Sequence, residues 1–370
     1  MNGFNLHRAY SIARKEVMHV LRDPFTLTLA LGLPVLLVTF FGYAIDFEVR
    51  NISLAVSDRD NGPAARRLKE AFTASGYFRL AEPGPGGPVA MLDSGRASAA
   101  LFIEPDFSKK IQGGSPAEVQ FVLDGSDNSK TAAVAGYLPG IRRAVQARLT
   151  GAPPREPLSL ATRFLYNPEL NSRWFTVPGL AAIIIGLLAI LLTALTVARE
   201  WENGSMELLL STPVRPLEII VGKLAPYGAL VLAGVFFVYL VSRLVFGVPF
   251  EGSLLLYLAA CLLFVTAALS QGLVISVITR QQQVAMQLSM LSGLLPSLLL
   301  SGFIFPVESM PAFFQYLTML LPPRWFMAAV RGITLKGADL GELAVPFLAL
   351  GLLSAAMLAL ALKKFKTDLE

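Results

Sequence analysis

The sequence predicts an α-helical polytopic membrane protein, with six transmembrane helices and a mixed α/β extracytoplasmic domain between the first two. Three observations lead to this fold class. Of the 370 residues, 54% are hydrophobic and only 15% are charged, whereas soluble domains carry about 25% charged residues. Six apolar runs are long enough to cross a bilayer. The first two runs are separated by a long, charged segment of domain size.

A transmembrane helix needs about 20 consecutive apolar residues. The runs that meet this length are Phe25–Ile45, Val177–Ala198, Leu224–Val245, Leu254–Ile278, Val284–Phe305 and Leu343–Leu362. The first run exceeds the apolar core of a signal peptide, and Gly42–Phe47 offers no small-residue cleavage site. We therefore expect residues 24–45 to remain in the protein as the first transmembrane helix.

Lysine and arginine in short loops predict the orientation, because cytoplasmic loops are enriched in both. One side would carry Arg8, Arg14, Lys15, Arg22, Arg199, Arg215, Lys223, Arg280, Lys363, Lys364 and Lys366. The other side, apart from the long domain, would carry only Arg243, Arg324, Arg331 and Lys336. We therefore expect both termini in the cytoplasm and residues 46–173 outside.

Residues 46–173 alternate strand and helix signals, which predicts a small α/β domain. The expected strands are Ile52–Ser57, Phe78–Leu80, Ala99–Ile103 and Glu118–Leu123, and the expected helices are Pro63–Ser75 and Asn128–Thr150. Pro83–Pro88 is rich in proline and glycine and predicts a loop.

Residues 1–23 predict an amphipathic helix. Apolar residues recur at helical spacing at Leu6, Tyr10, Ala13, Val17 and Val20/Leu21, and Arg8, Lys15 and Arg22 repeat every seven residues on another face. Such a helix is expected to lie in the cytoplasmic membrane interface, with its cations near anionic lipid headgroups. The alternative is a plain positively charged flank. Asp23-Pro24 would break the helix before the first transmembrane helix begins.

The most informative stretch lies in the cytoplasmic loop 199–223. It reads Arg199-Glu200-Trp201-Glu202-Asn203-Gly204-Ser205-Met206-Glu207-Leu208-Leu209-Leu210-Ser211-Thr212-Pro213. Asn203-Gly204 indicates a turn, and Ser205 would cap a short helix over Met206–Leu210. Three leucines forming an apolar patch beside acidic residues favour docking into a groove of a partner protein over a solvated loop.

This stretch resembles the loop of type-2 ABC exporter permeases, which reads like E-R-E-x-G-T-x-E-x-L-L-x-[ST]-P. Here one extra residue shifts the acid–glycine spacing, and Ser205 takes the threonine position. Ser301–Pro311 resembles the family's G-x-x-F-P-x-x-x-M-P, and Pro322–Trp325 through Arg331-Gly332 is similar to its outer re-entrant segment. Val56-Ser57-Asp58 followed by Ala65–Leu68 resembles the bacterial multidrug-type subgroup with a large extracytoplasmic domain.

The resemblance, which covers nearly the whole chain, implies the membrane-spanning permease subunit of an ATP-driven exporter in the bacterial inner membrane. Residues 174–370 would hold five transmembrane helices. The residues implied to couple to the ATPase are Arg199, Glu200, Glu202, Gly204, Ser205, Glu207, Leu208, Leu209, Leu210 and Pro213. The outer re-entrant segment 303–341 would contain Phe305, Pro306, Met310, Pro311, Arg324 and Arg331. The implied substrate is drug- or lipid-like and leaves the cytoplasm or the inner leaflet.

The resemblance also implies the partners. These are cytoplasmic ABC ATPase subunits and a second permease subunit, in a homo- or heterodimer with the first and fifth transmembrane helices near its interface. A periplasmic adaptor protein and membrane lipids are further candidates.

The chain itself is not expected to be an enzyme or to bind a cofactor. No G-x-x-x-x-G-K-[ST] run occurs, and Gly222-Lys223 lacks its upstream glycine, so ATP and Mg are expected on the partner ATPase. The single cysteine, Cys261, excludes an internal disulfide, and His7 and His19 make a poor metal site. The net charge of +5 follows the membrane topology, which disfavours nucleic acid as a partner.

Polar residues within the apolar runs are few. Gln271, Gln287, Ser292 and Pro296 could line a substrate path, whereas the alternative is hydrogen bonding between helices. The centres of the runs contain no Asp or Glu, which weighs against a proton- or ion-coupled secondary exporter. That carrier remains one alternative, and a membrane-anchored receptor or scaffold that uses the outer domain is another. A neighbouring ATPase gene would favour the ABC permease, and inverted repeats would favour the carrier.

Overall fold

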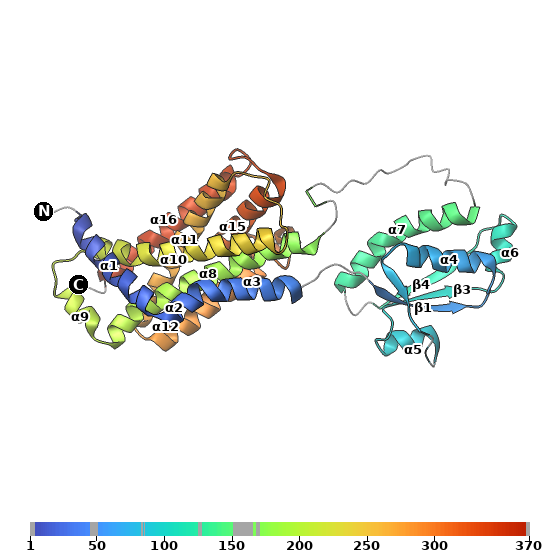
Figure 1. The fold of residues 1–370 in the computed structure, drawn as a ribbon, viewed down its shortest axis with the longest axis horizontal. Helices are drawn as coiled ribbons and strands as arrows, with labels where there is room; N and C mark the ends of the chain where they lie inside the picture. Colours follow the sequence, from blue (N-terminus) through green and yellow to red (C-terminus); the bar gives the residue numbers. More distant parts are fainter. Residues whose placement is uncertain are drawn as a thin grey trace. The chain divides into compact units, whose positions relative to one another are not determined.

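A computed structural model describes residues 4–44, 51–82, 84, 86–124, 128–150, 166–167 and 171–367. The chain divides into two compact units (Figure 1). Met1–Asp46 and Phe164–Glu370 form a helical unit, and Phe47–Arg163 form an α/β unit.

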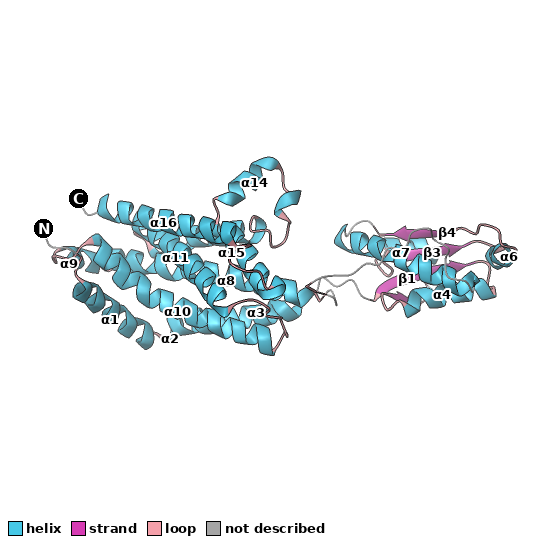
Figure 2. Ribbon diagram, turned by 90° about the horizontal axis from the view of Figure 1, so that it is seen from above, coloured by secondary structure: helices cyan, strands magenta, loops and turns pink. Residues whose placement is uncertain are grey.

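The helical unit contains long apolar helices joined by short helical segments (Figures 1 and 2). In chain order these are α1 (Leu6–Arg22), α2 (Pro24–Leu27), η1 (Thr28–Gly32), α3 (Leu33–Ala44), α8 (Ser172–Glu202), α9 (Ser205–Leu210), α10 (Pro216–Leu244), α11 (Leu254–Thr279), α12 (Gln282–Ser289), η2 (Met290–Leu294), α13 (Leu295–Leu299), η3 (Val307–Ser309), α14 (Ala312–Met319), α15 (Pro322–Arg331), η4 (Gly332–Lys336) and α16 (Ala344–Thr367). The predicted break at Asp23-Pro24 is confirmed, because α1 ends at Arg22 and the Asp23 carboxylate caps α2 by accepting from the Phe25 and Thr26 amides.

Five helical stretches within the described residues are long and apolar enough to cross a membrane. They are Pro24–Ala44, Ser172–Glu202, Pro216–Leu244, Leu254–Thr279 and Ala344–Phe365, and each overlaps one of the predicted runs. The chain is therefore a polytopic membrane protein.

The remaining run, Val284–Phe305, departs from the prediction. Its helix passes through the π-helical segment η2, continues as α13 and ends at Leu299, so the expected end at Phe305 is wrong. Pro296 explains the irregular stretch, since proline has no N–H to continue an α-helical ladder and a π-helical turn shifts the bonding register before it. A sixth transmembrane helix remains a prediction.

Helix α8 is the core of the helical unit. In its most apolar stretch 83% of the residues are buried, against 17% for α16, and a helix that is apolar all round is expected to be enclosed by others. Figure 2 shows α8 among α3, α10 and α11. The closest approach is to α11, where Gly272 leaves no space for a Cβ atom against the Ile190 carbonyl and the Thr193 hydroxyl of α8.

The α/β unit is built on a four-stranded sheet in the order β2-β1-β3-β4. The strands are β1 (Ile52–Asp58), β2 (Phe78–Leu80), β3 (Ala99–Ile103) and β4 (Val119–Leu123), and the helices are α4 (Pro63–Ala74), α5 (Gly87–Asp93), α6 (Phe107–Gln112) and α7 (Asn128–Thr150). β1 pairs in parallel with β2 and β3, and β4 is antiparallel to β3, with Leu101 opposite Phe121. The four predicted strands are confirmed, with ends that differ by at most one residue.

Helices cover both faces of this sheet. Leu54 and Leu101 pack beneath α4 and α7, whereas Ala55 packs on Met91 of α5. The sequence did not predict α5 or α6. The expected Pro83–Pro88 loop is wrong at its end, because α5 starts at Gly87 and Pro88 occupies its first turn, where the missing N–H costs nothing. At the end of β1, the Ser108 hydroxyl of α6 donates to the Asp60 carboxylate.

Candidate functional site

The loop after α8 starts with a sharp turn. Gly204 has φ +69°, a left-handed conformation that glycine adopts without steric cost, and its amide donates to the Trp201 carbonyl at 3.1 Å. Helix α9 begins directly afterwards. Ser205 therefore does not cap α9 from outside, as the sequence suggested. It lies in the first turn, and its hydroxyl donates to the Glu200 carbonyl at 3.3 Å.

One face of helix α9 packs against the helical unit, and the other face is exposed. Met206 is 1% exposed and Leu209 is half-buried, and both pack in a cluster with Trp201 and Phe365. Leu208 is 71% exposed. The expected patch of neighbouring leucines is therefore divided, since Leu209 packs on the chain itself and most of Leu208 is exposed. The side chains of Glu207 and Leu210 lie outside the described part.

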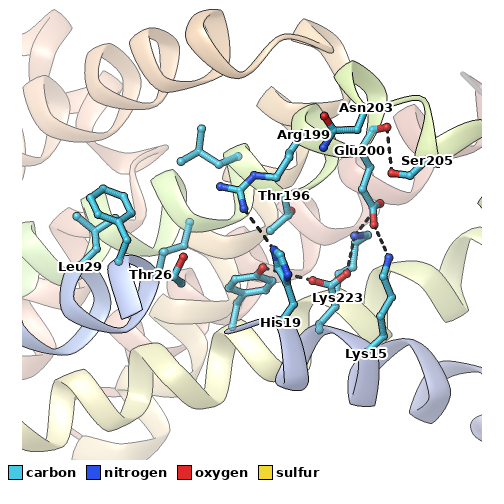
Figure 3. A pocket seen from close by; sticks show the side chains of 15 residues that line it. Lys15, His19, Thr26, Leu29, Thr196, Arg199, Glu200, Asn203, Ser205 and Lys223 are labelled. Atoms are coloured by element: carbon cyan, nitrogen blue, oxygen red, sulfur yellow. Dashed lines mark hydrogen bonds and ion pairs between the residues drawn. The ribbon is translucent and has the colours of Figure 1, made fainter. Parts of the chain in front are cut away.

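A buried cluster of charges joins α1, α8 and α10 next to this turn (Figure 3). The Lys223 ammonium, on a side chain only 2% exposed, donates to Glu16 Oε1 at 2.9 Å and lies 2.8 Å from Glu200 Oε2. Lys15 Nζ lies 3.0 Å from Glu200 Oε1, and the Tyr227 hydroxyl donates to Glu16 Oε2 at 3.3 Å. Each carboxylate thus has a cationic partner, as buried charges require.

A second connection holds the start of α1 to the start of α10. The Glu218 carboxylate, on a fully buried residue, accepts from the Asn5 amide at 2.8 Å and from the Arg215 amide at 3.0 Å. The Arg8 guanidinium lies 4.0 Å from Glu218 and donates to the Pro213 carbonyl. Pro213 therefore contacts α1 through its backbone.

A third connection holds the end of α8 to the start of α12. Arg199 Nε donates to Gln282 Oε1 at 3.2 Å, and Glu202 Oε1 accepts from the Gln282 amide at 2.7 Å. Arg199 Nη1 is 3.3 Å from His19 Nε2. Because arginine can only donate, a hydrogen bond here requires His19 Nε2 as the acceptor.

A pocket of about 170 Å³ among α1, α8 and α10 is lined by Lys15, Glu16, His19, Arg199, Glu200, Lys223 and Tyr227 (Figure 3). Within the described residues, no group of three His, Cys, Asp or Glu side chains could hold a metal ion. Lys15, Glu16, Glu200, Lys223 and Tyr227 together link α8 to α1 and α10, and this buried cluster is called the junction. A displacement of the α8–α9 turn would be transmitted through it to α1 and α10.

The family model described as "ABC-2 family transporter protein" matches residues 24–363. The chain belongs to the ABC-2 family. The probable multidrug ABC transporter permease YbhS of Escherichia coli (strain K12) is 33% identical over 335 residues, which cover 89% of each chain. YbhR of the same strain, also a probable multidrug ABC transporter permease, is 33% identical over 338 residues, or 90% of this chain and 91% of YbhR. The inner membrane transport permease YhhJ of that strain is 30% identical over 372 residues, or 98% of each chain.

Two of the candidate path residues of this ABC-2 protein contact each other. Gln271 Nε2 of α11 lies 3.3 Å from Ser292 Oγ of η2, so these two join neighbouring helices. Gln287 and Ser292 are exposed on the α12–η2 surface, and Pro296 is half-buried in α13. A path lining remains a prediction for all four.

The segment predicted to lie outside includes α14 and α15. Pro311 precedes α14, and the Met310 carbonyl accepts from Gln315 Nε2 at 2.8 Å. Arg324 Nη1 donates to the Gln315 carbonyl at 2.8 Å, and Arg331 Nη1 donates to the Gly302 carbonyl at 3.0 Å. Phe305 and Pro306 are exposed in the preceding loop.

The sequence alone did not indicate a role for Glu16 and Lys223, which form the junction, or for Glu218, which joins the starts of α1 and α10. A signal for Glu16 was present, because it recurs at helical spacing with Ala9, Ile12 and Val20, and these four form the buried face of α1. An acid on such a face needs a partner. Of the residues expected on the apolar face, Leu6, Tyr10, Val17 and Leu21 are exposed on this chain, Ala13 is half-buried and Val20 is buried.

Proposed function

We propose that this ABC-2 protein is the membrane-spanning permease subunit of an exporter whose ATP is hydrolysed, with Mg, by a separate ATPase, and that α9 is the helix the ATPase contacts. The observation that carries the proposal is the 71% exposure of Leu208 on a short helix whose other face is anchored by buried Met206. An exposed leucine on a fixed amphipathic helix suits a groove in a partner. The relatives named multidrug permeases support an efflux role.

The junction supports a route for coupling. A force on α9 would pass to α8 through the Gly204 turn, and from α8 to α10 through Glu200 and Lys223. Lys15 and Glu16 would carry it to α1. Paired buried charges resist separation, so the elements would move as one body.

The proposed topology places α1, α9 and the end of α16 in the cytoplasm and the α/β unit outside, in the bacterial inner membrane, with the α12–α13 segment as the sixth span. The apolar exposed residues of α1, Leu6, Tyr10 and Leu21, support a position in the interface. Single cysteines at Ser115 and Ser211, in a chain without the native cysteine, should label from outside and inside respectively. Labelling of both from one side would refute this topology.

The proposed cargo is a drug- or lipid-like amphipathic molecule, and the proposed assembly contains two permease and two ATPase subunits. The side chains of Gln287 and Ser292 are exposed on the single chain, on a surface that the proposed topology places in the membrane. They support a role in a path or in the contact with a second subunit, because polar groups facing lipid are costly.

Leu208→Asp tests the coupling proposal. It would place an unpaired charge in the ATPase contact, which costs a few kcal/mol when desolvated and should weaken the complex at least about tenfold. The matched control is Leu340→Asp, the same change at a residue 57% exposed in the loop before α16. Leu209→Asp is unsuitable, because Leu209 packs on its own chain.

The assay is recovery of the ATPase with the permease from membranes, followed by substrate-stimulated hydrolysis. We expect both to fall for Leu208→Asp and to remain for the control, with thermal unfolding unchanged in each. Full recovery and hydrolysis in Leu208→Asp would refute the role of α9. Export that persists without ATP and stops with a protonophore would favour the ion-coupled carrier, and an outer domain that signals without any export would favour the receptor.

A further inference from the structure

A second pocket lies near the start of α8, opposite the junction, and contains an incompletely paired arginine. Its volume is about 460 Å³, within the range of small-molecule sites. Arg331 donates through Nη1 to the Gly302 carbonyl, and its guanidinium lies 3.8 Å from the centre of the Phe175 ring. Its Nε and Nη2 atoms are buried without a hydrogen-bond partner among the described residues. A buried guanidinium with unused donors is costly unless an acceptor completes it.

Two further features of the lining favour an anionic acceptor. The Ser301 hydroxyl is buried, with the residue 3% exposed, and it also has no partner among the described residues. Arg324 adds a second positive charge to the pocket. Glu308 is exposed and is the one carboxylate in the lining, so the pocket carries a net positive charge.

The rest of the pocket wall is apolar. Ile304, Val307, Trp325 and Met327 line it together with the Phe175 ring. A ligand that satisfies both parts has an anionic head for the guanidinium and hydroxyl, and an apolar body for these side chains. Guanidinium recognises carboxylate and phosphate oxygens through paired hydrogen bonds.

We propose that this pocket binds an anionic amphiphile, with its carboxylate or phosphate on Arg331 and Ser301 and its apolar body against Ile304 and Trp325. The same head chemistry occurs in a phospholipid and in a soluble amphiphile, and the test separates the two sources. It needs no ATPase, so its outcome is independent of the coupling proposal.

Trp325 provides the reporter, because it lines the pocket and bromine quenches indole fluorescence on contact. The full chain, with Trp174 and Trp201 replaced by phenylalanine, is titrated with 12-bromododecanoate and with 12-bromododecanol, which has the same tail without the charge. We expect saturable quenching by the acid and at least tenfold weaker quenching by the alcohol. Nanodiscs of brominated phosphatidylglycerol or brominated phosphatidylcholine form the lipid arm, in which stronger quenching by the anionic lipid identifies a lipid site.

Arg331→Gln should raise the half-saturating concentration of the acid about tenfold or more, since a charge-assisted pair is lost. The matched control is Arg243→Gln, which removes an arginine that also donates to a backbone carbonyl but does not line this pocket. Glu308→Gln should tighten binding by removing the opposing charge, and it keeps the test decisive if Arg331→Gln fails to fold. Equal quenching by acid and alcohol, no quenching in either arm, or unchanged binding in both Arg331→Gln and Glu308→Gln would overturn the proposal.

Discussion

Lys223→Met should strongly destabilise the helical unit, because it removes the shared cationic partner of two carboxylates. The Lys223 ammonium is the shared partner of two carboxylates, Glu16 at 2.9 Å and Glu200 at 2.8 Å, and the lysine side chain is 2% exposed. Methionine fills a similar volume, but Glu16, whose side chain is 5% exposed, then keeps the Tyr227 hydroxyl as its one side-chain partner among the described residues. Removing one partner of a buried ion pair costs about 3–5 kcal/mol.

Lys15→Met is the matched control, because Lys15 is the exposed member of the same cluster. Lys15 contacts the same Glu200 at 3.0 Å, but its side chain is 63% exposed. Solvent screens such a pair, so Lys15→Met should cost no more than about 1 kcal/mol. Glu16→Gln combined with Lys223→Met should recover much of the single-variant loss, because the buried position 16 then carries no charge that needs a partner.

The native cysteine supplies the assay. Cys261 is fully buried in α11 and is the chain's single cysteine, so reaction with a thiol-specific fluorophore reports thermal unfolding. For a unit of this size, about 1 kcal/mol shifts the midpoint by roughly 2–4 °C. Lys223→Met should therefore lower it by about 6–20 °C, and Lys15→Met by less than about 4 °C. Equal midpoints for the two variants would show that the buried cluster contributes no more than a surface pair.

Two further predictions follow from close packing and from acid titration. Gly272→Ala should destabilise the helical unit by about 1–3 kcal/mol or more, because its Cβ would meet α8 backbone, whereas Gly228→Ala meets only a flexible leucine methyl group at 3.4 Å and should be tolerated. The same cysteine assay compares them, and equal losses would contradict the close contact. In the α/β unit, the hydrogen bond from the Ser108 hydroxyl lowers the pKa of the Asp60 carboxyl below its usual value. Its contribution is therefore present above the usual pKa of about 4 and is lost as the pH falls through the lower folded-state value. Acid unfolding of a separately produced segment 46–163, followed by circular dichroism, should lose this step in Asp60→Asn, and an unchanged acid profile would count against it.

The sequence by itself determined the membrane class, the apolar helices and the strands of the α/β unit. Hydrophobic length and alternation are local properties, so a run such as Leu254–Ile278 shows its helix without reference to any neighbour. The break at Asp23-Pro24 was visible for the same reason, since proline acts on its own backbone. The motif order placed the chain in its family.

Only the tertiary structure decided which polar groups meet. Glu16 and Lys223 are 207 positions apart, and nothing in either local sequence names the other. Their pairing depends on the rotation of α1 and α10 about their axes, which is set by packing along whole helices. The same holds for Arg331, whose burial beside Phe175 and Gly302 arises from α8 and the α13–α14 loop. Periodicity specifies which face of a helix is buried, whereas the partners on that face are fixed by contacts between distant segments.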